Sequence, residues 1–264
     1  MQPSDRTILR VSGVHKSFSS AGGSTPALNG INLEVAAGSF LSIIGPSGCG
    51  KSTLLQIMAG LVKPTKGTVF YERDAVDGPP PGVLYVFQQY TRSLFPWKTV
   101  KSNVAFGLES KGDMSRSEID TRTCDLIALV KLTGFERHYP WQLSGGMQQR
   151  ASIARALSFD PELLLMDEPF GALDEIVRDK LNEQLLRLWD VTKKTVLFVT
   201  HSIPEAVFLS TRIVVMSPRP GRIHDVIECG FPRDRTLDIR ETPEFLEVAH
   251  RVRDGLRAGH SYDD

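Results

Sequence analysis

The sequence predicts an α/β protein built on a mostly parallel β-sheet, with antiparallel strands near the N-terminus and a helical subdomain inserted in the middle. Short, nearly continuous apolar runs at 40–44 and 163–166 are typical of strands buried on both faces of a parallel sheet. The helical pattern at 176–189 separates two such runs, which implies right-handed crossovers. Apolar residues recur at helical spacing throughout residues 99–159, which indicates an inserted helical segment.

The first strands alternate apolar and polar residues, as strands with one buried face do. Residues 8–11 and 31–35 follow this pattern, and the glycine-rich segment 22–24 marks a loop between them. Further strands are expected at 83–87, 163–166, 196–199 and 213–216, and helices at 52–59, 176–189 and 242–258. The last helix has apolar residues on one face, so we expect it to pack back on the core.

These patterns predict one domain over residues 1–230, followed by a C-terminal extension with one helix over 231–264. Within the domain, the α/β core is expected at 6–90 and 160–230, and the helical subdomain at 95–158.

Composition mainly excludes classes of protein. The 264 residues are 41% hydrophobic and 23% charged, which disfavours disorder, collagen-like repeats and long coiled coils. A formal net charge of zero gives no indication of a nucleic-acid partner. No apolar run approaches the ~20 residues that span a bilayer, and the first residues lack a secretory-signal pattern. Three widely spaced cysteines suit a reducing cytosol better than a disulfide framework.

A phosphate-binding loop follows the buried run at 40–44. Residues 45–53 match the pattern G-x-x-x-x-G-K-[ST] and stand between an expected strand and an expected helix. The glycines let backbone N–H groups surround phosphate oxygens, and the helix directs its positive end at the same anion. Lys51 would supply charge to the β- and γ-phosphates, and the Ser52 hydroxyl can coordinate Mg²⁺. The predicted nucleotide contacts are Gly45, Pro46, Ser47, Gly48, Cys49, Gly50, Lys51, Ser52 and Thr53.

One cysteine lies within this loop. Because Cys49 is close to Lys51 and to a helix N-terminus, we expect its thiolate to be favoured and its alkylation to block ATP binding. The alternative is that Cys49 is simply a small residue that fills space.

An acid pair ends the strand expected at 163–166. Successive side chains of a strand point to opposite sides, so Asp167 and Glu168 can have different tasks. Asp167 is the candidate for holding Mg²⁺, and Glu168 for polarising the attacking water as a general base. The loop and the acids together predict a nucleoside triphosphatase.

Residues 143–150, Leu-Ser-Gly-Gly-Met-Gln-Gln-Arg, resemble the signature motif of ABC (ATP-binding cassette) ATPases. Ser144 is a good N-cap, and Gly145 and Gly146 leave the first helical N–H groups uncovered, which makes a second anion-binding helix end. The resemblance extends over about residues 6–230. It implies a P-loop NTPase core and a head-to-tail dimer in which each signature motif closes over the ATP of the other copy.

The resemblance also implies roles for single residues. Gln88 would reach the metal and sense the γ-phosphate, His201 would touch the γ-phosphate, and residues 172–174 would contact the partner copy. Phe18 is our choice for the aromatic residue that stacks on adenine. The implied catalytic residues are Lys51, Gln88, Glu168 and His201; the nucleotide contacts outside the phosphate loop are Phe18, Gln88, Ser144, Gly145, Gly146, Gln148 and Asp174; the Mg²⁺ ligands are Ser52, Gln88 and Asp167.

One position departs from the family pattern. Ser202 stands where relatives usually carry an acid after the histidine. Because Ser202 can still cap the following helix, with Pro204 in its first turn, we expect activity to survive.

The chain carries one short cassette and no membrane helix, so it resembles the separate ATP-binding subunit of an importer. Residues 95–100, 139–144 and 216–223 are similar to the nitrate/sulfonate/taurine importer group. This resemblance implies ATP and Mg²⁺ as cofactors and a peripheral position on the cytoplasmic face of the inner (plasma) membrane. The implied partners are a second copy of the chain, integral membrane permease subunits and, indirectly, a periplasmic or lipid-anchored solute-binding protein. The alternative is a soluble ABC ATPase without a permease, of a regulatory or repair type.

Overall fold

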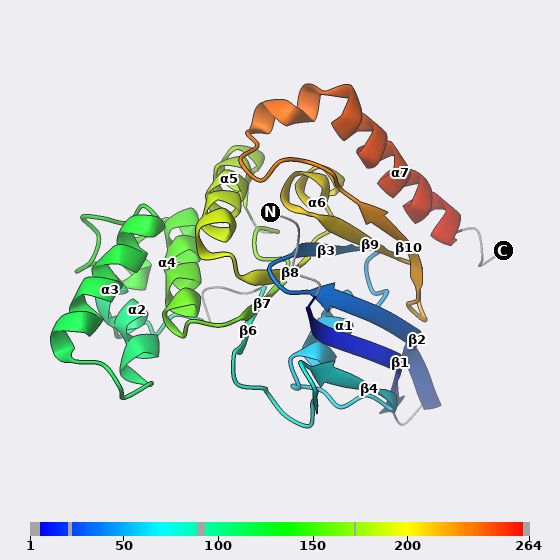
Figure 1. Ribbon diagram of the computed structural model, residues 1–264, viewed down its shortest axis with the longest axis horizontal. Helices are drawn as coiled ribbons and strands as arrows, with labels where there is room; N and C mark the ends of the chain where they lie inside the picture. The colour runs from blue at the N-terminus through cyan, green and yellow to red at the C-terminus, as the bar shows by residue number, and fades with distance from the viewer. Residues whose placement is uncertain (1–5, 21–22, 89–92, 172, 261–264) are drawn as a thin grey trace.

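A six-stranded sheet lies at the centre of the molecule (Figure 1). The computed structural model describes residues 6–20, 23–88, 93–171 and 173–260, and its strand order is β10-β9-β3-β8-β7-β6. The strands are β3 (Phe40–Ile44), β6 (Val83–Val86), β7 (Leu163–Asp167), β8 (Thr195–Val199), β9 (Arg212–Met216) and β10 (Ile223–Glu228). All neighbours pair in parallel except β10, which is antiparallel to β9. The predicted α/β class with a mostly parallel sheet is confirmed.

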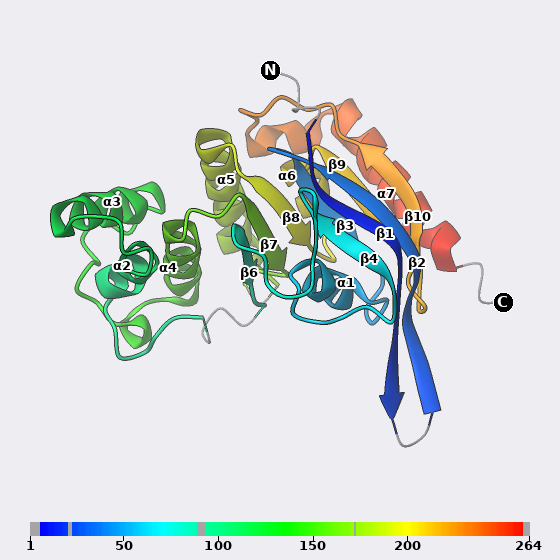
Figure 2. The ribbon, with the colours of Figure 1, turned by 60° about the horizontal axis from the view of Figure 1, so that its bottom comes forward.

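A second, antiparallel sheet of order β2-β1-β4-β5 covers one side of the core. Its strands are β1 (Thr7–Ser20), β2 (Gly23–Ala36), β4 (Lys66–Tyr71) and β5 (Asp74–Ala75). The sequence patterns predicted much shorter strands, because the outer part of the hairpin formed by β1 and β2 is exposed and has no apolar alternation. That outer part projects from the body of the molecule (Figure 2).

Helix α1 (Lys51–Met58) lies between the two sheets. Its residues Leu54, Leu55 and Met58 are fully buried in one cluster with side chains from both sheets. The opposite face of the central sheet belongs to a second cluster, in which Phe40 and Phe198 pack against the later helices. Both faces of the parallel sheet are therefore covered, as its continuous apolar strands require.

The inserted helices form a block beside the sheet (Figure 1). They are α2 (Val100–Glu109), α3 (Arg116–Leu129), the 3₁₀ helix η2 (Pro140–Gln142) and α4 (Gly145–Ser158). Val100, Val104 and Leu108, each about one helical turn from the next, are buried. Several buried residues of this block, among them Val104, belong to the same cluster as the sheet, so the apolar interior continues from the core into the insertion.

Three more helices and a short 3₁₀ segment complete the chain: α5 (Glu175–Thr192), α6 (Ile203–Leu209), η3 (Leu237–Glu241) and α7 (Pro243–His260). Helix α7 lies against α6, β9 and β10 and buries Phe245, Ala249 and Val252, while Leu256 is half-buried. The expected return of this helix onto the core is confirmed. Within the described ranges, no helix has both the length and the apolar character needed to cross a membrane.

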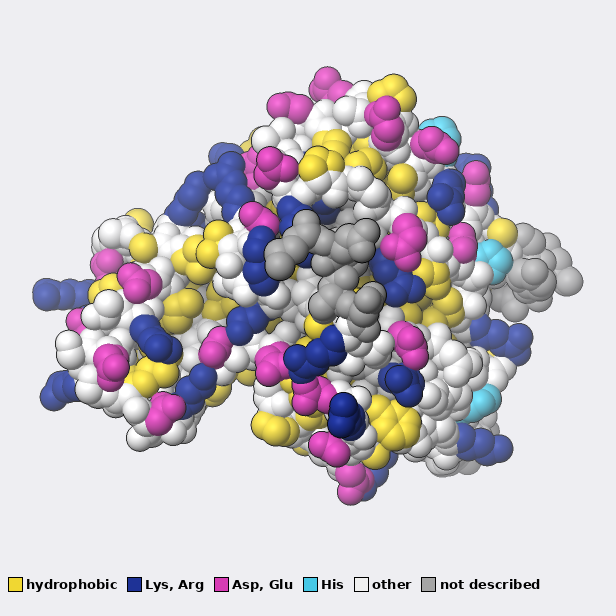
Figure 3. All heavy atoms as spheres, viewed as in Figure 1, with side chains coloured by type: hydrophobic (Ala, Val, Ile, Leu, Met, Phe, Trp, Pro, Cys, Tyr) yellow, Lys and Arg dark blue, Asp and Glu magenta, His cyan; other side chains and the backbone are white. Residues whose placement is uncertain are grey.

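Charged side chains of both signs are interspersed over the face shown in Figure 3. This mixture agrees with the formal net charge of zero.

Candidate nucleotide-binding and hydrolysis site

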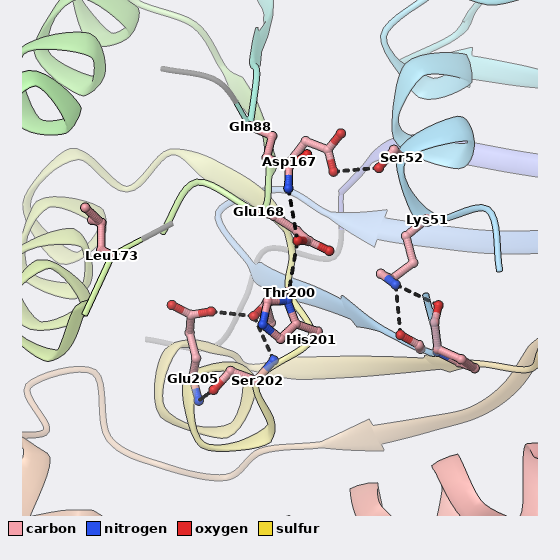
Figure 4. Close-up of polar contacts among 12 residues, drawn as sticks. Lys51, Ser52, Gln88, Asp167, Glu168, Leu173, Thr200, His201, Ser202 and Glu205 are labelled. Atoms are coloured by element: carbon pink, nitrogen blue, oxygen red, sulfur yellow. Dashed lines mark hydrogen bonds and ion pairs between the residues drawn. The ribbon is translucent and has the colours of Figure 1, made fainter. Parts of the chain in front are cut away.

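The phosphate loop connects the buried end of β3 to the first residue of α1 (Figure 4). Gly48 and Gly50 have φ values of 77° and 102°, a region that residues with a Cβ rarely adopt. The buried Lys51 ammonium donates hydrogen bonds to the carbonyl oxygens of Gly45 (2.8 Å) and Pro46 (2.9 Å). The residues of the sequence pattern thus form a loop whose backbone holds the Lys51 ammonium.

The base of the long hairpin packs on this loop. A Cβ added to Gly50 would lie 2.8 Å from Leu28 Cδ2 and 3.0 Å from the carbonyl oxygen of Ala27. Distances this short leave no room for a side chain, so the glycine is needed for packing as well as for its backbone conformation.

The loop between β9 and β10 supports the phosphate loop from another side. A Cβ added to Gly221 would lie 2.1 Å from the carbonyl oxygen of Cys49. The Gly221 N–H donates to the carbonyl oxygen of Ala27, and the Asn29 N–H donates to the carbonyl oxygen of Gly221, both at 2.9 Å. Sequence analysis treated residues 216–223 only as a marker of the importer group and missed this contact.

The expectation that the thiolate form of Cys49 is favoured is wrong. Cys49 is 1% exposed, and its burial raises the pKa of the thiol. The Lys51 charge and backbone hydrogen bonds lower this pKa, but by less than burial raises it. The structure therefore favours the alternative, a small residue packed beside Gly45.

Asp167 is buried at the end of β7, with a hydroxyl on each carboxylate oxygen. Ser52 Oγ donates to Oδ1 at 2.9 Å, and the Tyr85 hydroxyl donates to Oδ2 at 2.8 Å. Burial raises the pKa of Asp167, and both hydrogen bonds oppose that rise. Sequence analysis missed Tyr85, because its position on the neighbouring strand β6 becomes relevant only when β6 and β7 pair.

Glu168 follows the last residue of β7 and points away from Asp167, and its side chain meets two other loops (Figure 4). Its Oε2 lies 3.3 Å from Gln88 Nε2 and 3.4 Å from His201 Nδ1. Its backbone has φ 42°, in the left-handed region, and its N–H donates to the carbonyl oxygen of Val199. The Glu168 side chain keeps 21% of its surface exposed, enough to meet a water molecule.

The donor atoms near Asp167 fit Mg²⁺. The Asp167 carboxylate, the Ser52 hydroxyl and the Gln88 amide all offer oxygen, which this hard cation prefers. Over the described part of the chain, no cluster of three or more histidine, cysteine, aspartate or glutamate residues could hold a metal ion by itself. This sparse set suits Mg²⁺, which is usually bound through one or two carboxylates together with substrate phosphates and water.

The signature motif lies at a cavity of about 380 Å³. Ser144 caps α4, since its Oγ accepts from the Met147 N–H at 3.4 Å, and Asp174 caps α5 in the same manner. Gln148 donates instead to the carbonyl oxygen of Leu143 at 3.1 Å. The cavity is lined by Ser144, Gly145, Gly146, Met147, Arg150, Leu173, Asp174, Val177, Lys180, Leu181 and Gln184, and thus by none of the phosphate-loop residues.

Two other residues that the sequence singled out are Phe18 and Ala172. Phe18 lies in the outer part of the hairpin, is 44% exposed, and has the Lys16 ammonium 5.0 Å from its ring centroid. Its contact with adenine stays a prediction. Ala172, the first residue of the expected dimer-contacting loop, lies outside the described residues.

The fold, the phosphate loop and the acid pair define a P-loop nucleoside triphosphatase. The ABC transporter family matches residues 28–171. The chain is 50% identical over 246 residues to an uncharacterized ABC transporter ATP-binding protein of Methanocaldococcus jannaschii, covering 92% of this chain and 89% of that protein. It is 43% identical to an aliphatic sulfonates import ATP-binding protein of Bacillus cereus, covering 92% and 94%. The chain belongs to the ATP-binding proteins of the ABC transporter family.

Solved structures agree with this assignment. A dimeric ATP-binding cassette in a post-hydrolysis state, bound to ADP and phosphate, matches with a TM-score of 0.73 and 35% identity, covering 85% of this chain and all of that one. The cbiO1 protein of Clostridium perfringens, part of an ABC transporter complex, has the same fold, with a TM-score of 0.76 over 98% of this chain and all of that one.

Proposed function

We propose that this chain is the ATP-hydrolysing subunit of an importer that drives uptake of a small nitrate-, sulfonate- or taurine-like solute through a separate membrane permease. One observation carries the hydrolytic part: Glu168 Oε2 lies within 3.4 Å of both Gln88 and His201, beside the loop that holds Lys51. The import part is supported by the aliphatic sulfonates import protein at 43% identity.

The chemistry follows from the positions of these groups. Backbone N–H groups of the phosphate loop and the Lys51 ammonium bind the β- and γ-phosphates. Ser52, Asp167 and Gln88 would hold Mg²⁺, which would supply positive charge against the phosphate oxygens. Glu168 accepts a proton from the water that attacks the γ-phosphorus, and ADP leaves with the bridging oxygen. His201, next to Glu168, steadies the transferred phosphoryl group.

The second half of each site comes from a second copy of the chain. Ser144, Gly145 and Gly146 present the N-terminal end of α4 at a cavity that no phosphate-loop residue lines. A helix N-terminus attracts an anion, so this end suits the γ-phosphate bound to another copy. The dimeric cassette found among the similar structures supports this arrangement.

A groove of about 300 Å³ runs along the edge strand β6 and is our candidate for the permease-docking site. It is lined by Leu84, Tyr85, Val86, Phe87, Ser93, Phe95, Ser152, Arg155, Ala156 and Phe159. Trp97 stacks on Phe95 and is 69% exposed, which leaves a large aromatic surface next to the groove. Because β6 leads directly to Gln88, a partner seated here would act close to the hydrolytic centre.

The Glu168→Gln variant tests the hydrolytic assignment. We expect steady-state ATP hydrolysis to fall at least about 100-fold, because the general base is lost while the triphosphate contacts remain. The variant should also accumulate as an ATP-bound dimer in size-exclusion chromatography. Lys51→Ala is the matched control, since it should lose ATP binding and remain monomeric. Hydrolysis by Glu168→Gln at the wild-type rate would exclude this role.

Reconstitution tests the importer assignment against the soluble alternative. The neighbouring genes are first searched for a multi-span membrane protein, which is combined with the chain in proteoliposomes, and a solute-binding protein is added with and without an alkyl sulfonate. Stimulation of ATP hydrolysis by the loaded binding protein supports the importer. If the chain neither co-purifies with that membrane protein in detergent nor responds to it, the soluble ATPase is the better assignment.

A further inference from the structure

A small set of hydrogen bonds holds the backbone on both sides of His201 (Figure 4). The Thr200 hydroxyl donates to Glu205 Oε2. The Ser202 N–H donates to Thr200 Oγ1 at 3.0 Å, and the Glu205 N–H donates to Ser202 Oγ at 3.4 Å. Thr200, before His201, is thus bonded to the side chain of Glu205. Ser202, after His201, is bonded to the backbone of Glu205, one turn into α6.

Glu205 is unusual because it is a carboxylate with only 4% of its surface exposed. Its burial raises the pKa of the carboxyl, and the Thr200 hydrogen bond and the Arg178 charge oppose that rise. Its other oxygen, Oε1, is buried without a hydrogen bond of good geometry in the described residues, although the nearby Asn182 side chain also lowers the pKa of the carboxyl. Capping α6 needs only Ser202, and an apolar side chain would fill the same space at lower cost, so the buried carboxylate needs another explanation.

Arg178 contacts a residue that lines the cavity of the signature motif. Its guanidinium donates to the carbonyl oxygen of Leu173 at 2.8 Å, and its charge acts on Glu205. Leu173 lines the cavity of the signature motif together with Asp174. Arg178 thus holds the Leu173 backbone, and its charge partly offsets the effect of burial on Glu205.

We propose that Glu205 is a positioning residue that fixes His201 beside Glu168. The inference rests on the proposed function, because the position of His201 matters only if the site hydrolyses ATP. Without the Glu205 carboxylate, the Thr200 hydroxyl, which accepts from the Ser202 N–H, loses its own acceptor, and the 3.4 Å contact between His201 and Glu168 is no longer imposed. The phosphate loop is untouched, so turnover should fall while ATP affinity stays.

Two substitutions at one position separate a positioning role from a general structural one. Glu205→Gln keeps the size of the side chain and an oxygen that accepts from Thr200, so its kcat should stay within about threefold of wild type. Glu205→Ala should lose about 10- to 100-fold in kcat, with the Kd for ATP changed less than about threefold. Thr200→Val removes the same hydrogen bond without removing the carboxylate, and we expect a similar loss; it carries the test if Glu205→Ala does not fold.

The decisive measurement is a double-mutant cycle with His201→Ala. If Glu205 acts through His201, then Glu205→Ala and Thr200→Val cause no further loss of kcat in the His201→Ala background. Losses that multiply with that of His201→Ala, or wild-type kcat in Glu205→Ala, would overturn the proposal. A wild-type chain that does not hydrolyse ATP would instead refute the proposed function.

Discussion

Asp167 and Glu168 are adjacent in sequence but have very different surroundings. Asp167 is buried with a hydroxyl on each oxygen, whereas Glu168 is partly exposed beside Gln88 and His201. The sequence predicted that the two acids differ, but it gave strand alternation as the reason, whereas Glu168 lies just after β7 with a left-handed backbone. Tyr85 could not be predicted as a partner of Asp167, because the periodicity of one strand does not say which side chain of its neighbour reaches the same carboxylate.

Removing the Tyr85 hydroxyl should weaken the proposed Mg²⁺ site. In Tyr85→Phe, Asp167 Oδ2 loses its hydrogen bond, so the already raised pKa of the carboxyl rises further and more of it is neutral at low pH. We expect the Mg²⁺ concentration for half-maximal ATP hydrolysis to rise roughly tenfold, and more at pH 6 than at pH 8. Mg²⁺ titrations at both pH values measure this effect.

Tyr71→Phe is the control, because Tyr71 lies on β4 near Arg6 and Glu162, away from the acid pair. An unchanged Mg²⁺ requirement in Tyr85→Phe would show that the hydroxyl does not support Asp167.

Cys49 should resist alkylation at neutral pH. Burial raises the pKa of its thiol, so the thiolate fraction is small at pH 7 and grows as the pH approaches that pKa. We expect iodoacetamide to modify the exposed Cys124 first, and Cys49 to react slowly at pH 7 and faster at pH 9. Peptide mass spectrometry gives both rates in one sample. Equal rates at pH 7 would contradict the burial of Cys49.

At the scale of elements, the strands and helices with clear periodicity were predicted close to their observed positions. The outer part of the hairpin of β1 and β2 was not, because exposed strand residues have no apolar alternation to detect. The support that the β9–β10 loop gives to the phosphate loop was missed for another reason. It joins residues that are far apart in sequence, and no local pattern records such a contact.

Gly221→Ala tests that support. The added methyl group would lie 2.1 Å from the Cys49 carbonyl oxygen, so the phosphate loop or its neighbour must move. Overpacking of this kind costs about 1–3 kcal/mol, and part of that cost should appear as weaker ATP binding, by roughly tenfold. Isothermal titration with ATP measures the change.

The matched control for this variant is Gly230→Ala, since an added Cβ at Gly230 meets nothing within 4 Å. If both variants bind ATP equally well, the β9–β10 loop does not hold the phosphate loop in place.

At the scale of the whole molecule, the apolar interior runs without a break from the helical insertion through the sheet to α7. The fold class was predictable because parallel strands, crossovers and the insertion have distinct periods along the chain. How closely α7 joins the core was only a general expectation for an amphipathic helix, and the structure shows which residues make the contact.

This continuity predicts that α7 unfolds together with the core. Phe245 is 3% exposed, so Phe245→Ala should lower the free energy of unfolding by about 3–5 kcal/mol in a single urea transition. Its neighbour Leu246 is 49% exposed, and Leu246→Ala should change that free energy by about 0.5 kcal/mol or less. A separate early transition in Phe245→Ala would mean that α7 unfolds on its own.

The left-handed backbone of Glu168 has a consequence for how this protein can be altered. At φ 42°, a residue with a Cβ costs roughly 1–2 kcal/mol, whereas glycine has no such penalty. Glycine at this position would relax the turn after β7 and would also remove the carboxylate that meets Gln88 and His201. With Glu168 as the general base that we propose, selection for thermal tolerance and selection for turnover favour different residues at position 168, and a library screened for heat resistance alone would drift toward an inert protein.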